Sequence, residues 1–79
     1  MKYKNSVYHD LKNIDRETAR RIMDEIGSVL SGNPKAGKAL SGNFKGLYSY
    51  RIGDYRVIYK IIGDCVLVLR VGDRGKVYR

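Results

Sequence analysis

Two Gly-Asp pairs constrain the fold of this chain more than any other feature, because they divide its second half into segments of β-type sequence. We expect strands over Leu47–Ile52, Tyr55–Ile62 and Val66–Val71, separated by Gly53-Asp54 and Gly63-Asp64. Two-residue connections of this kind are typical of tight hairpins, and glycine supplies the backbone freedom that such turns need. Consecutive strands should therefore run antiparallel, as a meander.

The pattern fixes the faces of these strands only in part. In the second segment, alternation separates one set of side chains, Tyr55, Val57, Tyr59 and Ile61, from the other, Arg56, Ile58, Lys60 and Ile62. Neither set is wholly polar, so alternation leaves open which of them meets the rest of the core. The third segment is apolar at successive positions, which is typical of a strand in the interior of a sheet.

Two helices should precede this sheet. Asn5 or Ser6 can cap a first helix over Val7–Asn13, and Asp15 can cap a second helix that ends near Ser31. Apolar residues recur in the second helix at steps of three and four, which indicates one buried face. These residues are Ala19, Ile22, Met23, Ile26, Val29 and Leu30.

The remaining segments are short. Met1–Lys4 can form at most a brief strand, and Leu40 and Phe44 should anchor the loop of residues 35–43 to the core. At 79 residues the chain should form one small domain, residues 1–79, with a thin hydrophobic core. A helix hairpin laid on a meander indicates an α+β fold.

Composition argues against several classes of protein. No apolar run approaches the length of a membrane span, and Met1–Asn5 lacks the apolar region of a secretion signal. We therefore expect a cytoplasmic protein with no membrane partner. The single cysteine, Cys65, excludes an internal disulfide and a metal site of clustered cysteines. The single histidine, His9, should be a surface residue of the first helix.

The charge distribution points to an anionic partner. The net charge is +8, with 16 basic residues against eight acidic ones. In residues 43–79 each of the acidic residues, Asp54, Asp64 and Asp73, follows a glycine and is explained by turn chemistry. The strands themselves carry arginines and no acid, which favours nucleic acid or another polyanion over solubility alone as the reason for the charge.

In their order and spacing, these features resemble the RelE/ParE toxin superfamily, and above all its RelE branch of ribosome-dependent mRNA interferases. The resemblance covers nearly the whole chain. It rests on Leu40-Ser41-Gly42, Tyr48–Arg51, Gly53–Tyr59, Val71–Arg74 and Val77-Tyr78. It implies an α+β fold in which a short N-terminal strand and a two-helix hairpin pack on a mainly antiparallel β-meander.

The resemblance also implies an activity and its residues. Members of the RelE branch cleave mRNA in the ribosomal A site without a metal or cofactor: a ribose 2′-hydroxyl attacks the adjacent phosphate, leaving a 2′,3′-cyclic phosphate and a 5′-hydroxyl. By position, the transition-state arginines fall on Arg56 and Arg74, a further basic residue on Arg51, and the aromatic that orients the nucleotide on Tyr78. The chain departs from the family at Ser49 and Arg51, where some members have two lysines, and at Asp73, where others have a histidine.

The residues agree with this chemistry on physical grounds. Phosphoryl transfer places charge on phosphate oxygens, and the planar guanidinium of arginine can bind two such oxygens while remaining charged. The structural alternative is that each arginine is solvated or paired with a turn aspartate. Tyrosines can stack on unpaired bases, although Tyr48, Tyr50, Tyr55 and Tyr59 are better explained as packing residues. Arg51, Arg56, Arg74 and Tyr78 should then converge in one concavity.

Partners follow from the same resemblance. We expect a RelB-like antitoxin, acidic and partly disordered, together with the ribosomal A site and its mRNA. Two alternatives remain open at this point. One is a ParE-like toxin that inhibits DNA gyrase and has no nuclease activity, and the other is an inactive homologue that only binds antitoxin or ribosome.

Overall fold

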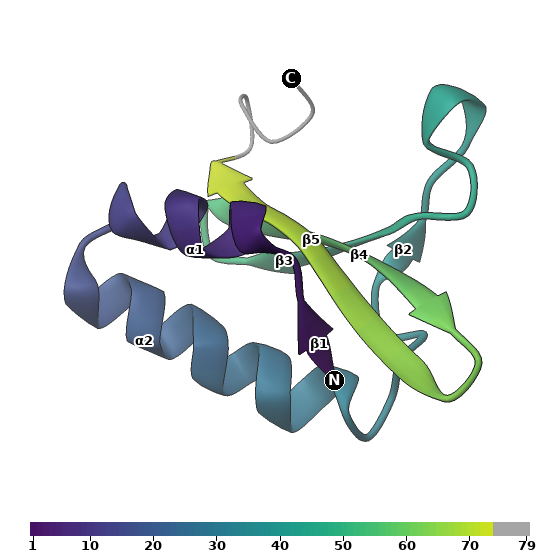
Figure 1. Ribbon diagram of the computed structural model, residues 1–79, viewed down its shortest axis with the longest axis horizontal. Helices are drawn as coiled ribbons and strands as arrows, with labels where there is room; N and C mark the ends of the chain where they lie inside the picture. Colours follow the sequence, from purple (N-terminus) through teal and green to yellow (C-terminus); the bar gives the residue numbers. More distant parts are fainter. Residues whose placement is uncertain (74–79) are drawn as a thin grey trace.

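The computed structural model describes residues 1–73, which form two helices packed on a mixed sheet (Figure 1). The sheet of this part of the chain has five strands in the order β1-β5-β4-β3-β2. The helical elements are α1 (Asn5–Lys12), α2 (Arg16–Glu25), a π-helical turn η1 (Ile26–Leu30) and a 3-10 turn η2 (Gly42–Phe44). The strands are β1 (Lys2–Tyr3), β2 (Lys38–Ala39), β3 (Tyr48–Ile52), β4 (Tyr55–Ile62) and β5 (Cys65–Asp73). The predicted α+β fold is confirmed.

The meander forms at the two predicted turns. Gly53 and Gly63 both have a φ of +59°, the left-handed conformation that glycine adopts without a steric penalty. β3 pairs antiparallel with β4, and β4 pairs antiparallel with β5. The brief N-terminal strand is also present, and β1 runs parallel to β5, with Lys2 opposite Leu67 and Tyr3 opposite Val68. This one parallel pairing places β5 inside the sheet over those two residues.

A β-bulge interrupts the pairing of β4 with β5. Ile58 lies opposite Arg70, whereas the next residue, Tyr59, lies opposite Val68, so Leu69 is the extra residue of β5. The bulge shifts the alternation of β5 by one position. As a result Val68 and Val71, which are three apart in sequence, both reach the core and are at most 1% exposed.

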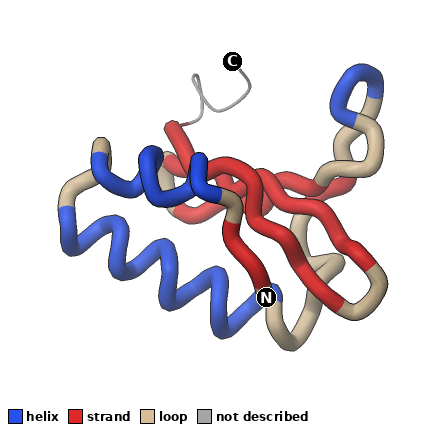
Figure 2. The backbone as a smooth tube through the Cα atoms, viewed as in Figure 1, coloured by secondary structure: helices blue, strands red, loops and turns tan. Residues whose placement is uncertain are grey.

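The core lies between the helices and one face of the sheet, since both helices lie on the same side of it (Figure 2). The helices contribute Val7, Ile22, Ile26 and Leu30, and the sheet contributes Ile52, Val57, Tyr59, Val66, Val68 and Val71. The alternation of β4 is thereby resolved. The set with Val57 and Tyr59 faces the helices, and the set with Arg56 and Lys60 faces away from them.

The helix starts were predicted with mixed success. Asp15 caps α2 as expected, because its carboxylate accepts a hydrogen bond of 3.1 Å from the Thr18 amide. Through η1 the helical backbone continues to Leu30, close to the predicted end. The expectation that Asn5 or Ser6 caps the first helix is wrong. Asn5 is already helical, and the Ser6 hydroxyl donates a hydrogen bond of 2.6 Å to the Leu69 carbonyl instead.

The connection from η1 to the sheet is held by Tyr59, a fully buried side chain of β4. Its hydroxyl donates to the Pro34 carbonyl at 2.6 Å and accepts from the Gly37 amide at 3.0 Å. A Cβ on Gly37 would lie 2.6 Å from this hydroxyl, so the close approach requires glycine. Leu40 and Phe44 were expected to anchor the loop of residues 35–43 to the core. For Phe44 this is wrong, because its side chain is 38% exposed, whereas Leu40 is half-buried.

Candidate functional site

The face of the sheet that points away from the helices carries two of the predicted site residues side by side. Arg51 on β3 lies directly opposite Arg56 on β4, and Arg56 lies opposite Gly72 on β5. We call Arg51, Arg56 and Gly72 the cation row. Like charges that face each other across two strands destabilise a sheet. The stability of the fold therefore gives no reason for this arrangement.

The two guanidinium groups of the cation row have no acidic partner in residues 1–73. Arg51 Nε donates to the Gly53 carbonyl at 3.0 Å, and Arg56 Nη1 donates to Ser49 Oγ at 3.4 Å. The ion pair found in this part of the chain joins Arg70 to Asp10. Pairing with a turn aspartate, the structural alternative for these arginines, is thus not observed for Arg51 or Arg56 within residues 1–73. Their charges remain available to an anion.

The surroundings of the row reinforce its positive character. Lys60 occupies a position on the same face of β4, and none of the positions on that face from Ser49 to Gly72 is acidic. Arg70 shares this face by register, but its charge is paired with Asp10. Ser49, where the family resemblance implies a lysine in some members, is only 4% exposed and contacts Arg56. A buried hydroxyl beside a guanidinium orients that group, whereas a lysine there would add a third charge.

Arg74 and Tyr78, the other two predicted site residues, lie outside the described residues. The predicted convergence of four side chains is therefore seen only for Arg51 and Arg56. In sequence, Arg74 directly follows Asp73, with which β5 ends, and Gly72 of the cation row lies one residue before Asp73.

The tyrosines of the sheet behave as packing residues, as predicted. The rings of Tyr48 and Tyr59 stack with centroids 5.4 Å apart and planes inclined by 18°. Burial raises the pKa of the Tyr59 hydroxyl, whose hydrogen bonds to two loop backbone groups already occupy it. This hydroxyl faces the helices and takes no part in the cation row. His9 is exposed on α1, also as predicted.

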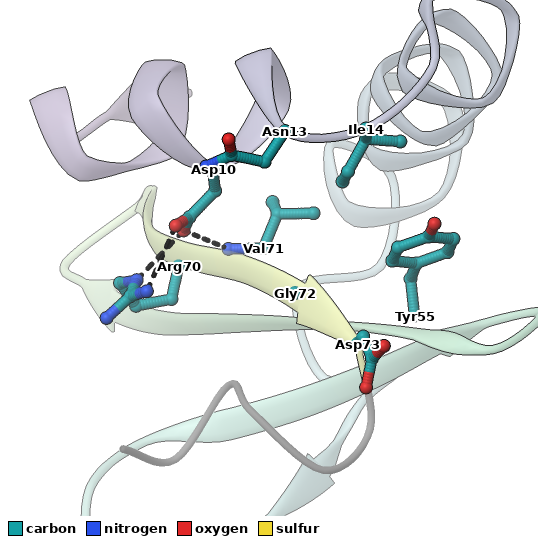
Figure 3. Close-up of a pocket in the computed structure, with 8 residues that line it drawn as sticks. All are labelled: Asp10, Asn13, Ile14, Tyr55, Arg70, Val71, Gly72 and Asp73. Carbon is teal, nitrogen blue, oxygen red and sulfur yellow. Dashed lines mark hydrogen bonds and ion pairs between the residues drawn. The ribbon is translucent and has the colours of Figure 1, made fainter.

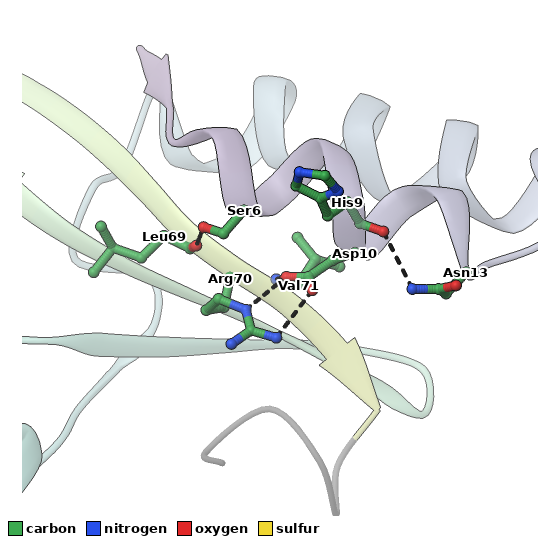
Figure 4. A network of polar contacts seen from close by, with 7 residues as sticks. All are labelled: Ser6, His9, Asp10, Asn13, Leu69, Arg70 and Val71. Carbon is green, nitrogen blue, oxygen red and sulfur yellow. Dashed lines mark hydrogen bonds and ion pairs between the residues drawn. The ribbon is translucent and has the colours of Figure 1, made fainter.

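Sequence reasoning missed a polar cluster where α1 meets the edge of β5 (Figure 4). The Asp10 carboxylate accepts from Arg70 Nε at 2.8 Å, from Arg70 Nη2 at 3.0 Å and from the Val71 amide at 2.9 Å. These hydrogen bonds raise the pKa of the Arg70 guanidinium further. Asp10 and Arg70 are 60 positions apart, and no local pattern marks either as a partner of the other.

A hollow of about 260 Å³ adjoins this cluster, between the C-terminal end of α1 and the end of β5 (Figure 3). Ile14 and Tyr55 line it on one side, and Gly72 and Asp73 on the other. Within residues 1–73 no group of three or more His, Cys, Asp or Glu side chains could hold a metal ion. In the same part of the chain, no helix is both long and apolar enough to cross a membrane.

Comparison with known proteins identifies the family to which this chain belongs. The family model described as the ParE toxin of type II toxin–antitoxin systems, parDE, matches residues 1–78. The chain belongs to the RelE/ParE toxin superfamily. A curated relative, Toxin RelE of Mycobacterium tuberculosis (strain ATCC 25618 / H37Rv), is 38% identical over 73 residues, which are 89% of this chain and 75% of that protein. The predicted family is thereby confirmed.

Two solved structures of superfamily members resemble this chain over most of its length. The toxin–antitoxin complex RelBE2 of M. tuberculosis matches with a TM-score of 0.86 and 28% identity, over 92% of this chain and 94% of the matched one. The RelB-RelE antitoxin–toxin complex of Methanococcus jannaschii matches with a TM-score of 0.75 and 26% identity, over 99% of this chain and 95% of the matched one. The sheet that carries the cation row therefore belongs to a RelE-type toxin fold.

Proposed function

We propose that this toxin is a metal-independent endoribonuclease that cleaves mRNA in the ribosomal A site. The observation that carries the proposal is the cation row, in which Arg51 and Arg56 face each other without an acidic partner in residues 1–73. A phosphodiester between the two guanidinium groups would relieve their repulsion. The resemblance of this chain to Toxin RelE supports the same reading.

In the proposed reaction the 2′-hydroxyl of a ribose attacks the adjacent phosphate. Negative charge builds up on the equatorial phosphate oxygens as the new bond to phosphorus forms and the bond to the 5′-oxygen breaks. Arg56, with Arg51 beside it, stabilises that charge, and a guanidinium can donate to two oxygens at once. Gly72 adds no side chain to the row, so a phosphate can approach the strand closely.

Arg74 and Tyr78 complete the proposed site. Arg74 supplies a further cation to the phosphate, and Tyr78 stacks on the nucleotide or orients it. The cation row contains no acid, histidine or lysine, so groups outside the row must take the proton from the 2′-hydroxyl and supply a proton to the leaving 5′-oxygen, which becomes the 5′-hydroxyl. We therefore expect slow cleavage of free RNA and efficient cleavage on the ribosome, which orients the mRNA and offers further groups.

We further propose a RelB-like antitoxin as the protein that holds this toxin inactive in the cytoplasm. The two similar solved structures are both complexes with an antitoxin. An acidic segment that folds on binding would neutralise Arg51 and Arg56 and exclude RNA from the row.

The test uses ribosomes programmed with mRNA and carrying a vacant A site. The purified protein should cut the mRNA within the A-site codon and leave a 2′,3′-cyclic phosphate and a 5′-hydroxyl. Arg56→Ala and Arg74→Ala should each abolish most of the cleavage. Arg20→Ala, which removes an exposed charge from α2 on the other side of the sheet, should cut like the parent. Cleavage by both arginine variants at the parental rate would exclude the proposed site.

One observation favours a second candidate, a toxin that inhibits DNA gyrase: the matching family model is described as the ParE toxin. A supercoiling assay separates the two functions. A gyrase inhibitor would stop supercoiling and leave A-site mRNA intact, whereas the proposed nuclease should do the reverse. A chain that does neither, and whose expression leaves cells growing normally, would be an inactive homologue that only binds its partners.

A further inference from the structure

The outer edge of β5 changes its partner part-way along the strand. β1 pairs with it at Leu67 and Val68, and the Lys4 amide still donates to the Val68 carbonyl at 2.9 Å. Beyond that point α1 takes over. The Ser6 hydroxyl donates to the Leu69 carbonyl at 2.6 Å, and the Asp10 carboxylate accepts from the Val71 amide at 2.9 Å. Side chains of a helix thus continue the edge where the short strand stops.

Asp10 is the stronger of these two attachments. Both of its carboxylate oxygens are engaged, one by the Val71 amide and by Arg70 Nε, the other by Arg70 Nη2. Its side chain is 13% exposed, so these charge-assisted hydrogen bonds are partly shielded from water. One turn away on the same helix, the side chain of Val7 is completely buried in the core. The carboxylate is therefore held by a well-anchored helix.

The attachment lies next to the cation row. Val71 precedes Gly72, which lies opposite Arg56, and β5 ends one residue later at Asp73. A contact that holds Val71 in place therefore also holds the end of β5 beside Arg56, from which the chain continues in sequence to Arg74. A carboxylate bound to Arg70 also withdraws that cation from the open face, so Arg51 and Arg56 define the anion position without a competitor on β5.

We propose that Asp10 is a positioning residue of the phosphate site, which fixes the end of β5 beside Arg56 through the Val71 amide and Arg70 (Figure 4). This role rests on the nuclease function proposed above. Geometry of this kind matters for catalysis, since a displacement of about 1 Å can lower a rate by roughly 100-fold. An ion pair that only stabilised the fold would leave the cleavage step unchanged once the protein was folded.

The test compares Asp10→Ala and Asp10→Asn with Ser6→Ala, a matched control that removes the other hydrogen bond from α1 to the edge of β5. Cleavage of A-site mRNA is followed in single turnover over a range of ribosome concentrations. Asp10→Ala should lower the maximal rate by about 10- to 100-fold, with the half-saturating ribosome concentration unchanged. Asp10→Asn, whose amide oxygen can still accept from the Val71 amide, should recover part of that rate, and Ser6→Ala should stay within about twofold of the parent.

Hydrogen exchange reports the same attachment without reference to activity. In folded Asp10→Ala the Val71 amide should exchange about tenfold faster or more, while the amides of β3 keep their parental rates. Unchanged exchange at Val71, or an Asp10→Ala enzyme that cleaves at the parental maximal rate, would overturn the positioning role and leave the nuclease function standing. A parent protein that does not cut A-site mRNA would instead overturn the nuclease function, and this role in catalysis with it.

Discussion

The pairing of Arg51 with Arg56 makes a prediction about stability that is independent of any activity. If the two guanidinium groups repel each other across the hairpin, losing either one removes the whole repulsion, and losing the second brings no further gain. The free energy of unfolding of the double variant, Arg51→Gln with Arg56→Gln, should therefore be lower than the value obtained by adding the effects of the two single changes. A double-mutant cycle isolates this coupling from the other contacts of each side chain.

The register sets the size of the effect. Opposite Cβ atoms lie roughly 5 Å apart in such pairs. Two unit charges roughly 6 Å apart repel by about 0.7 kcal/mol at the dielectric constant of water, by more near a protein surface, and by less if the hydrogen bonds to Gly53 and Ser49 hold the two guanidinium groups farther apart. Since Arg51 is exposed, we expect a coupling of about 0.5–1 kcal/mol at 10 mM salt, which lies within the range of roughly 0.2–1 kcal/mol for cross-strand pairs. At 1 M salt, where the screening length is about 3 Å, it should fall below about 0.2 kcal/mol.

Urea denaturation is the suitable assay, because urea leaves the ionic strength unchanged. Each of the four proteins of the cycle is titrated with urea at both salt concentrations. Its free energy of unfolding is obtained from the midpoint urea concentration, with one slope of free energy against urea used for all four. A cycle of Arg51→Gln with Arg20→Gln serves as the control, since α2 lies on the other side of the sheet and the coupling should be close to zero. The reasoning is refuted if the Arg51–Arg56 coupling is absent or attractive at 10 mM salt, or if it grows as salt is added.

Two further predictions concern Tyr59 and Asp15. Tyr59→Phe leaves the Pro34 carbonyl and the Gly37 amide without their hydrogen-bond partner, and should lower the free energy of unfolding by about 1–3 kcal/mol. The control is Tyr48→Phe, at the ring stacked on Tyr59, which should change the free energy of unfolding by less than about 0.5 kcal/mol. Equal losses of stability in the two variants would contradict this prediction. The hydrogen bond to Thr18 lowers the pKa of the Asp15 carboxyl, so this cap contributes stability above the ordinary aspartate pKa and loses it as the pH falls through the lowered value. Between pH 6 and pH 2 the midpoint of thermal unfolding should fall more steeply for the parent than for Asp15→Asn, whose cap does not titrate. Parallel plots of midpoint against pH for the two proteins would contradict this role of the Asp15 carboxylate.

The parts of the fold that could be predicted have local causes. The turns at Gly53 and Gly63 require a positive φ, which glycine adopts readily. The turns fix where the strands begin and end, and therefore that neighbouring strands pair antiparallel. Asp15 caps a helix through a residue three positions away. The register that sets Arg51 opposite Arg56 follows from a two-residue turn between them, so the cation row is in large part a local consequence of the hairpin.

The parts that could not be predicted depend on contacts between distant segments. The bulge at Leu69 has no turn residue to announce it and is explained by core packing of Val68 and Val71. Ser6 looked like a cap because its hydroxyl can bond to its own helix, but it bonds to β5 instead. Nothing in the sequence around Asp10 marks it as a partner of β5. Its partner on β5 is chosen by the packing of α1 on the sheet, which no window of sequence contains.

The central claim, that the cation row holds the scissile phosphate, is tested most directly by Arg56 variants in single-turnover cleavage of A-site mRNA. Arg56→Ala should lower the rate at saturating ribosomes by about 100-fold or more, as removal of one preorganised donor does elsewhere, while ribosome binding stays within about threefold. Arg56→Lys keeps the charge but loses the planar guanidinium, so its cleavage rate should lie between those of the parent and of Arg56→Ala. A rate for Arg56→Ala equal to that of the parent, at equal ribosome occupancy, would contradict the account.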